Sequence, residues 1–302
     1  WDMHVVQSGQ IDNVAEDEED AFQQIRDFIS YLPNTVGEVA QRVDTGDDPE
    51  RRPQELLDII PTNRRQGYDA RALIRHVVDN GDFFEMRKLY ASGIITGFAR
   101  MDGWSVGVIG SDPMSKAGAM DGNAADKYTH FLDLCDSFNL PLLIFLDMPG
   151  FMLGSHAERI ATMRRGARAL IASAECQVPK IEFMVRKSYG VAADAPNSIG
   201  LPNGINLRFG WPSGEWGGIP IEGGVAAAYR REIEAADNPA AHREAIEERL
   251  LRLRSPFKAA HKGDVVDLID PRETRALACR FVKLAQPKLA ELANRPKRAV
   301  RP

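Results

Sequence analysis

Two loops carry the residues best suited to chemistry, and in both of them the useful groups belong to the backbone. One loop is Asp-Met-Pro-Gly-Phe at residues 147–151, and the other is Arg-Lys-Ser-Tyr-Gly-Val-Ala at residues 186–192. Each follows a run typical of a buried strand, and ligands of open α/β folds bind outside the carboxyl ends of strands. Small residues let a ligand approach the backbone, and paired N–H groups can stabilise an oxygen that becomes negative during a reaction. From the residues alone, a structural turn and an oxyanion-binding site both stay open.

Motifs for other chemistries are absent from the sequence. It contains no phosphate-binding loop, no dinucleotide-binding glycine fingerprint, no zinc-protease motif and no Gly-x-Ser-x-Gly nucleophile elbow. The six histidines lack metal-ligand spacing, so the sequence predicts no metal site. Asp194 is the acid just after the second loop, and from the residues alone an ordinary turn aspartate is the favoured interpretation.

Alternating strands and helices must position these loops. Strands are predicted over residues 94–100, 104–109, 141–146, 180–186 and 265–269, and helices over residues 70–79, 123–138, 157–175, from about 222, and 272–292. Asp69 is a candidate N-cap, and Asp102-Gly103 supplies the positive φ of a tight hairpin. The wholly apolar run at residues 141–146 is typical of a strand covered on both faces. The alternation favours an α/β fold.

The N-terminal part has a different pattern. An acidic run at residues 16–20 precedes apolar residues at helical spacing, which predicts a helix whose acids complement its dipole. Those apolar residues are Phe22, Ile25, Phe28, Ile29 and Leu32. The polar stretch from Asp44 to Pro53 that follows is dense in charge, which predicts a solvated loop and a domain boundary.

Composition excludes several classes of protein. The chain has 302 residues, 44% of them hydrophobic and 27% charged, an ordinary globular balance. Its net charge of −5 argues against a nucleic-acid partner. No apolar run approaches the ~20 residues that span a bilayer, and the first residues lack a signal-peptide pattern. Three scattered cysteines indicate reduced thiols. We therefore expect a cytoplasmic protein without a membrane partner.

An ordered set of motifs extends over nearly the whole chain. The motifs lie at residues 67–69, 93–100, 131–141, 147–151, 164–167, 178–181, 186–190, 211–212 and 270–275. Together they resemble the carboxyltransferase (β) subunit of biotin-dependent acyl-CoA carboxylases, the propionyl-CoA carboxylase type in particular. The resemblance implies a crotonase-type α/β fold, a spiral of β–β–α units. It also implies a C-type carboxyltransferase domain at residues 47–302, preceded at residues 1–46 by the tail of an N-type domain and a connector.

The resemblance implies a reaction as well. In that family, carboxybiotin on a carrier protein supplies CO2 to the α carbon of a short-chain acyl-CoA through an enolate, and the cofactor itself provides the base. The implied partners are an N-half subunit, a biotin carboxyl carrier and biotin carboxylase, in a homo- or hetero-oligomer as large as a hexamer. The sequence does not identify the acyl-CoA.

Site residues follow from the same resemblance. The backbone of Gly190, Val191 and Ala192 is expected to form the oxyanion hole for the ureido oxygen of biotin. Asp194 matches a family aspartate that influences the choice of acyl chain. The residues expected to form the biotin and substrate site are Pro149, Gly150, Phe151, Tyr189, Asp194, Gly223 and Gly224.

Departures from the family pattern gather at this site. The family has Tyr-Gly-Gly-Ala where this chain has Val191 in the third position. A β-branched residue resists positive φ. If the position requires positive φ, Val191 stores about 1–3 kcal/mol of strain, and if it does not, the valine side chain narrows the biotin site. Pro220 removes an N–H donor, and residues 196–206 are rich in Gly, Pro and Asn. Two alternatives therefore stay open: a biotin-independent crotonase-type acyl-CoA decarboxylase or hydrolase, and a non-catalytic half of a hetero-oligomer.

Overall fold

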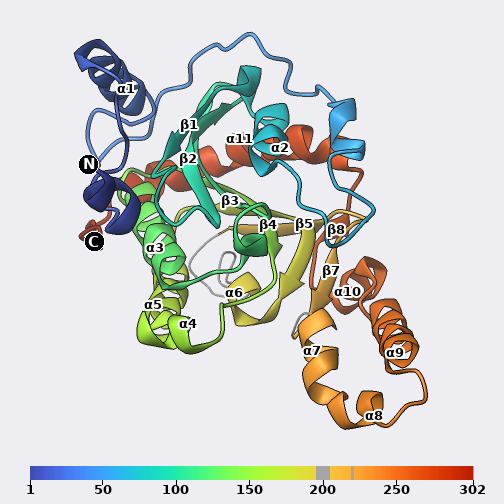
Figure 1. The fold of residues 1–302 in the computed structure, drawn as a ribbon. Coiled ribbons are helices and arrows are strands. Elements are labelled where there is room, and N and C mark those ends of the chain that lie inside the picture. The colour runs from blue at the N-terminus through green and yellow to red at the C-terminus, as the bar shows by residue number, and fades with distance from the viewer. Residues whose placement is uncertain (195–204, 219–220, 302) are drawn as a thin grey trace.

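A mixed β-sheet runs through the centre of the computed structural model, which describes residues 1–194, 205–218 and 221–301 (Figure 1). Its strands are β1 (Phe83–Met86), β2 (Ile94–Met101), β3 (Trp104–Ser111), β4 (Leu142–Met148), β5 (Lys180–Tyr189), β6 (Asn206–Gly210), β7 (Glu215–Gly217) and β8 (Asp267–Leu268). Their order is β1-β2-β3-β4-β5-β6-β8, and β7 pairs with the end of β5. The pairs β1–β2 and β2–β3 are antiparallel, and the remaining pairs are parallel.

Helices cover both faces of this sheet. The α-helices are α1 (Glu18–Ser30), α2 (Ala70–Val77), α3 (Gly122–Ser137), α4 (Ser155–Arg159), α5 (Thr162–Glu175), α6 (Gly190–Asp194), α7 (Ile221–Ala228), α8 (Arg230–Glu234), α9 (Pro239–Leu253), α10 (Pro256–Lys262) and α11 (Thr274–Ala293). Figure 1 shows α3 and α5 on one side and α2 and α11 on the other. Alternate residues of β4 belong to two different hydrophobic clusters. Leu142 and Ile144 belong to one cluster, and Leu143 and Phe145 belong to the other. The predicted strand with two covered faces is confirmed.

Several local predictions are confirmed by their hydrogen bonds and dihedral angles. The Asp69 carboxylate accepts hydrogen bonds from the amides of Arg71 and Ala72 and so caps α2. Between β2 and β3, Asp102 and Gly103 have φ values of 49° and 77°, as a two-residue hairpin turn requires.

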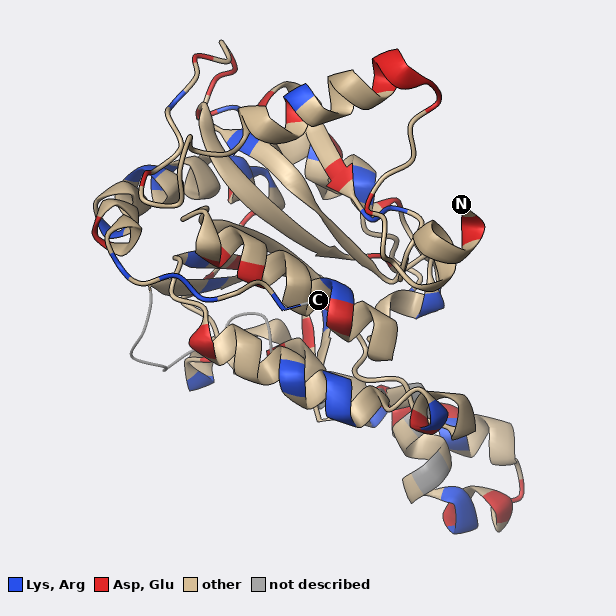
Figure 2. Ribbon diagram, turned by 90° about the vertical axis from the view of Figure 1, so that its left-hand side faces the viewer, with Lys and Arg blue, Asp and Glu red and all other residues tan. Residues whose placement is uncertain are grey.

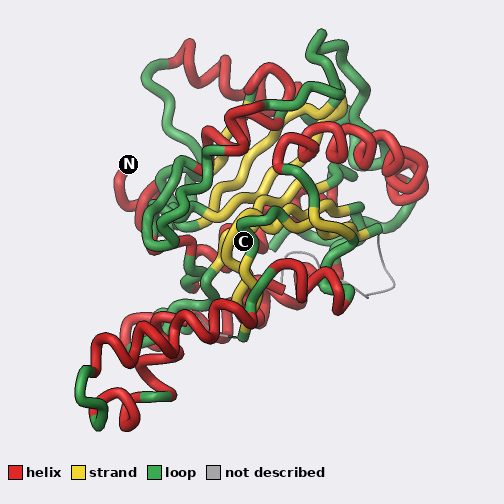
Figure 3. Tube along the Cα trace, turned by 90° about the vertical axis from the view of Figure 1, so that its right-hand side faces the viewer, coloured by secondary structure: helices red, strands yellow, loops and turns green. Residues whose placement is uncertain are grey.

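Three elements differ from the sequence prediction. The helix expected over residues 157–175 is divided into α4 and α5, because Ala161 between them is left-handed with φ 54°. The strand expected over residues 265–269 is only the short β8. The single helix expected from about residue 222 is an arm built from α7, α8 and α9, which projects from the sheet body (Figures 1 and 3).

The N-terminal helix packs on the sheet through only part of its apolar surface. Phe28 contacts Phe98 of β2 with ring centroids 5.8 Å apart, and Tyr31 stacks on the same ring at 5.8 Å. The remaining predicted seam faces outward, since Phe22, Ile25 and Ile29 are 53–60% exposed. Figure 2 shows acidic residues at the N-terminal end of this helix, where they complement its dipole. The helix is therefore confirmed, and much of its apolar face stays uncovered in this chain.

The connector at residues 44–53 is an irregular stretch with Asp44, Asp48, Glu50 and Arg52 exposed, as predicted, but it also has buried partners that its charge does not predict. The fully buried Arg275 of α11 forms ion pairs with Asp47 at 3.2 Å and Asp79 at 2.8 Å. It also donates a hydrogen bond to the Asp48 carbonyl. Arg51 pairs with Asp47 as well. One connector acid, Asp47, is thus a partner of a buried arginine, a contact that the local sequence pattern does not reveal.

The cysteines are free and buried, and burial raises the pKa of Cys176 and Cys279 to about 12. In the part of the chain that the structure describes, no helix has the length and apolar character needed to cross a membrane.

Candidate active site

A buried ion pair joins the ends of the two central strands. Asp147 of β4 accepts hydrogen bonds from the Arg186 guanidinium at 2.9 Å and from the Lys187 amide at 3.0 Å. Arg186 also donates to the Gln66 carbonyl at 2.8 Å and lies over the ring of Tyr68. Both loops singled out in the sequence are therefore held together at one edge of the sheet, as parallel strands predict.

Tyr189, the last residue of β5, belongs to a second polar network. Its hydroxyl donates to Glu215 of β7 at 2.6 Å, and Arg64 donates to the same carboxylate. Burial and the neighbouring Glu215 raise the pKa of Tyr189 well above its usual range, so its hydroxyl stays a donor. Burial acts to raise the pKa of Glu215, but the hydrogen bonds from Arg64 and Tyr189 outweigh it and lower that pKa. The guanidinium of Arg254 lies 4.9 Å from the Tyr189 ring centroid.

The turn after Tyr189 places its positive φ on glycine. Gly190 has φ +64°, and a Cβ on it would lie 3.1 Å from the Gly218 carbonyl oxygen. Val191 is not among the described residues with positive φ, so the strain considered for it is absent. Val191 and Ala192 are the second and third residues of α6, and amides at that position have no acceptor within a helix. The turn therefore presents backbone N–H groups without requiring a second glycine.

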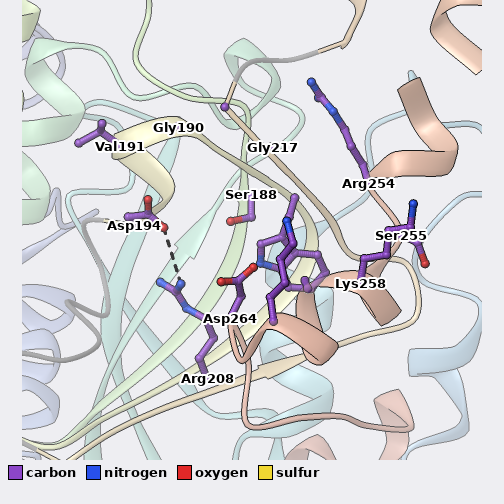
Figure 4. Close-up of a pocket in the computed structure, with 14 residues that line it drawn as sticks. Ser188, Gly190, Val191, Asp194, Arg208, Gly217, Arg254, Ser255, Lys258 and Asp264 are labelled. Carbon is purple, nitrogen blue, oxygen red and sulfur yellow. Dashed lines mark ion pairs between the residues drawn. The ribbon is translucent and has the colours of Figure 1, made fainter. Parts of the chain in front are cut away.

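An open pocket of about 530 Å³ lies beside this turn (Figure 4). Its described lining residues are Ser188, Gly190, Val191, Asp194, Arg208, Trp216, Gly217, Gly218, Arg254, Ser255, Lys258, Ala259, Lys262 and Asp264. Val191 is 58% exposed and lies on one side, with Ser255 and Lys258 across from it. The valine side chain therefore borders the pocket without closing it.

Charged groups dominate the pocket walls. Arg208 of β6 is buried against Glu182, with its Nε 3.3 Å from the Glu182 Oε1, and reaches Asp194 at 3.7 Å. Asp194 itself is mostly exposed. Lys258 and Lys262 stand on the α10 side. The pocket therefore has polar donors around it, and one of its walls is a backbone turn. This arrangement is suited to a ligand with several oxygen atoms.

The structure brings only some of the predicted site residues to this pocket. Gly190, Val191 and Asp194 line it, whereas Tyr189 and Ala192 are buried just behind its wall. Pro149, Gly150 and Phe151 are not among its described lining residues.

The loop at residues 149–151 instead supports the turn from behind. The Gly150 backbone lies close to the Tyr189 carbonyl, since a Cβ on Gly150 would be 3.5 Å from that oxygen. The Phe151 ring packs over Gly166 of α5.

Two other predicted glycines lie in the arm. Gly223 and Gly224 belong to the first turn of α7, which contributes no residue to the described pocket lining. Pro220 and most of the loop at residues 196–206 lie outside the described residues. Among the described residues, no group of three or more His, Cys, Asp or Glu side chains is arranged for a metal ion.

Several pocket residues were not singled out in the sequence. These are Arg208, Trp216, Arg254, Lys258, Lys262 and Asp264. Lys258 and Lys262 are separated by four positions around the buried Ala259, a spacing that indicates one helix face. Nothing in the local sequence shows that this face meets a turn some 70 residues earlier.

Comparisons with known proteins agree with the motif order. Residues 1–300 match the carboxyl transferase domain family. The chain is 40% identical over 273 residues to a propionyl-CoA carboxylase carboxyltransferase subunit of Haloferax mediterranei, covering 90% of this chain and 52% of that protein. It is 40% identical over 268 residues to the methylmalonyl-CoA decarboxylase subunit alpha of Veillonella parvula, covering 89% and 51%.

A solved structure gives the same result for the fold. The chain resembles the transcarboxylase 12S crystal structure, a hexamer with methylmalonyl-coenzyme A and methylmalonic acid bound, with a TM-score of 0.85 and 36% identity. The match covers 100% of this chain and 56% of that one. The crotonase-like α/β fold is thereby confirmed, and the chain spans about half the length of the relatives it matches.

Proposed function

The chain belongs to the carboxyl transferase domain family, and we propose that it is the C-type half of a biotin-dependent acyl-CoA carboxyltransferase. The activity would transfer CO2 to or from the α carbon of a short-chain acyl-CoA. The observation that carries the proposal is the turn at the end of β5, in which Gly190 and the following Val191 line an open pocket. In this proposal residues 1–46 are the end of an N-type domain and residues 47–302 the C-type domain.

The residues at the pocket fit biotin. A ureido ring is small and uncharged and carries one strong acceptor oxygen, and Gly190 and Val191 of the turn line the pocket without closing it. Val191 and Ala192 would donate to that oxygen, and Gly190 would allow close approach. Biotin, when bound on its carrier, supplies the CO2 unit and the base for the α proton.

The remaining residues position this turn. Arg186 and Asp147 hold the end of β5 against β4. The hydrogen bond from Tyr189 to Glu215 holds the backbone that leads into Gly190. The loop with Gly150 backs the same strand, and Asp194 at the pocket is proposed to influence the choice of acyl chain. In this assignment the chain's part is to bind and orient, with the backbone stabilising negative charge.

Partners follow from the half-length match. The proposed partners are an N-half subunit that binds the acyl-CoA thioester, a biotin carboxyl carrier and biotin carboxylase, assembled in the cytoplasm. The uncovered apolar face of α1 is consistent with a surface that another subunit covers. The relative with 36% identity is described as a hexamer, and we propose an assembly of comparable size.

Decarboxylation is a second candidate direction. The relative from Veillonella parvula is named as a methylmalonyl-CoA decarboxylase subunit, and the same stabilised enolate serves both directions of carboxyl transfer. The two alternatives, a biotin-independent enzyme and a non-catalytic half, lose part of their support. The reason is that Val191 is not strained and does not close the pocket.

A reconstituted transfer assay tests the proposal. The chain, its N-type partner and a biotinylated carrier are combined, and movement of labelled carboxyl from the carrier to propionyl-CoA is followed. We expect transfer that avidin abolishes. Consumption of a carboxyacyl-CoA that avidin leaves unchanged would indicate the biotin-independent alternative. Assembly with the partner but no binding of biotin or CoA would indicate a non-catalytic half.

A further inference from the structure

Two lysines on α10 form a cationic wall of the pocket. Lys258 and Lys262 both line it, and the buried Ala259 holds their helix against the body. Residues four apart lie one above the other on a helix, so both ammonium groups can reach the same functional group of a ligand. Neither lysine forms an ion pair with another residue in the described ranges 1–194, 205–218 and 221–301.

The other cations of the pocket already have partners. Arg208 faces the buried Glu182 and also reaches Asp194. Arg254 lies over the Tyr189 ring. The acids lining the pocket are Asp194, which is engaged by Arg208, and the exposed Asp264. The cations therefore outnumber the acids, and the excess positive charge lies with the lysines.

One of these lysines stands opposite the backbone turn. In Figure 4, Lys258 lies across the pocket from Val191 and Gly190. The turn offers N–H donors suited to an oxygen of partial negative charge, whereas ammonium groups suit a full carboxylate. A ligand that satisfies both walls carries an acceptor oxygen toward the turn and a carboxylate toward α10. The indole Nε1 of Trp216 also has no acceptor among the described residues.

We propose that Lys258 and Lys262 bind the carboxylate of the CO2 unit that the enzyme transfers, and so select carboxylated over uncarboxylated ligands. The inference rests on the proposed function. The same carboxylate chemistry has two sources, the carboxyl group borne by the biotin ring and that of a carboxyacyl thioester. Two ammonium groups with three donors each can satisfy both carboxylate oxygens in either case.

Calorimetric titration of the complete chain with malonate at low ionic strength tests the site. We expect Lys258→Gln with Lys262→Gln to weaken malonate binding about tenfold or more, because two charge-assisted contacts are lost. The double arginine variant should retain binding, since the charge is kept. Added salt should weaken binding to the original chain, as it does for exposed charges.

The matched control is Lys88→Gln with Lys283→Gln, two exposed lysines outside this pocket. It should bind malonate like the original chain. Circular dichroism melting verifies that each variant is folded. The proposal is overturned if malonate does not bind the original chain, or if the pocket variant and the control bind it equally.

Titrations with methylmalonyl-CoA and propionyl-CoA, in the presence of the N-type partner, separate the two sources. If the pocket variant loses the preference for methylmalonyl-CoA, the carboxylate belongs to the thioester. If that preference survives while malonate binding is lost, it belongs to the biotin side. Both results support the lysine site. Because malonate binding needs no turnover, failure of the site is distinguishable from failure of the transfer reaction.

Discussion

At the scale of single residues, the turn after β5 depends on Gly190. It does not depend on position 191, where this chain has valine in place of the family's glycine. Gly190 carries the left-handed backbone and packs against the Gly218 carbonyl. Val191 follows in helical conformation with its side chain largely exposed. The departure from the family pattern therefore falls where a side chain is tolerated.

Gly190→Ala should be harmful on two counts. The left-handed conformation costs a residue with a side chain about 1–2 kcal/mol, and the new Cβ must displace the Gly218 carbonyl. We expect the free energy of unfolding in urea to fall by about that amount and carboxyl transfer to be lost. Gly46→Ala is the control, because Gly46 has φ +68° with no atom within 4 Å. Equal losses of transfer in both variants would contradict the role of the turn.

Glu215 gives a pH-dependent prediction at the same scale. Its folded-state pKa lies below the usual 4.5, so its contribution to stability is present above pH 4.5 and is lost as the pH falls further. Glu215→Gln should lower the free energy of unfolding by about 1–3 kcal/mol at pH 7. The difference from the original chain should shrink below pH 4.5 in urea titrations across that range. A difference that stays constant to pH 3 would disprove the assignment.

At the scale of elements, the sequence predicted what neighbouring residues decide. The Asp69 cap and the Asp102-Gly103 hairpin depend on chemistry within a few positions, and both were foreseen. The division of the predicted helix at Ala161 was missed, because alanine carries no signal for a left-handed conformation. The arm and the α10 wall were missed for another reason: α7, α8 and α9 pack on one another, and α10 is placed by its contacts with β7 and β8, which no local pattern shows.

The connector is the clearest case of such a distant contact, and it can be tested with two arginines of one helix. Arg275→Met leaves buried carboxylates without their cation and should lower the free energy of unfolding by about 3–5 kcal/mol. Arg280 pairs with Glu50 of the same connector at 2.7 Å, but both side chains are more than half exposed. Arg280→Met should therefore cost less than about 1 kcal/mol. Urea unfolding measures both, and similar costs would restore the solvated-loop interpretation.

At the scale of the whole molecule, the chain matches about half of each relative reported above and exposes an apolar helix face. Phe22, Ile25 and Ile29 lie at i, i+3 and i+7 on α1, so their side chains form one stripe. The stripe adjoins a hollow lined by Phe28, Phe84 and Met86. Isolated exposed apolar side chains are ordinary, but a stripe continuous with a hollow is typical of a surface that a partner buries.

Replacing the stripe should therefore separate assembly from folding. Phe22→Gln, Ile25→Gln and Ile29→Gln together remove apolar side chains that the isolated chain leaves exposed, so the thermal unfolding midpoint should change little. Association with the N-type partner should weaken at least tenfold in sedimentation velocity, because the apolar area available for burial is lost. Leu284→Gln on α11 is the control, since Leu284 is 75% exposed on another helix. If the control weakens association as much as the triple variant, the partner does not dock on α1. If the triple variant instead unfolds, the stripe belongs to the core of this chain, and the half-molecule interpretation loses its structural support.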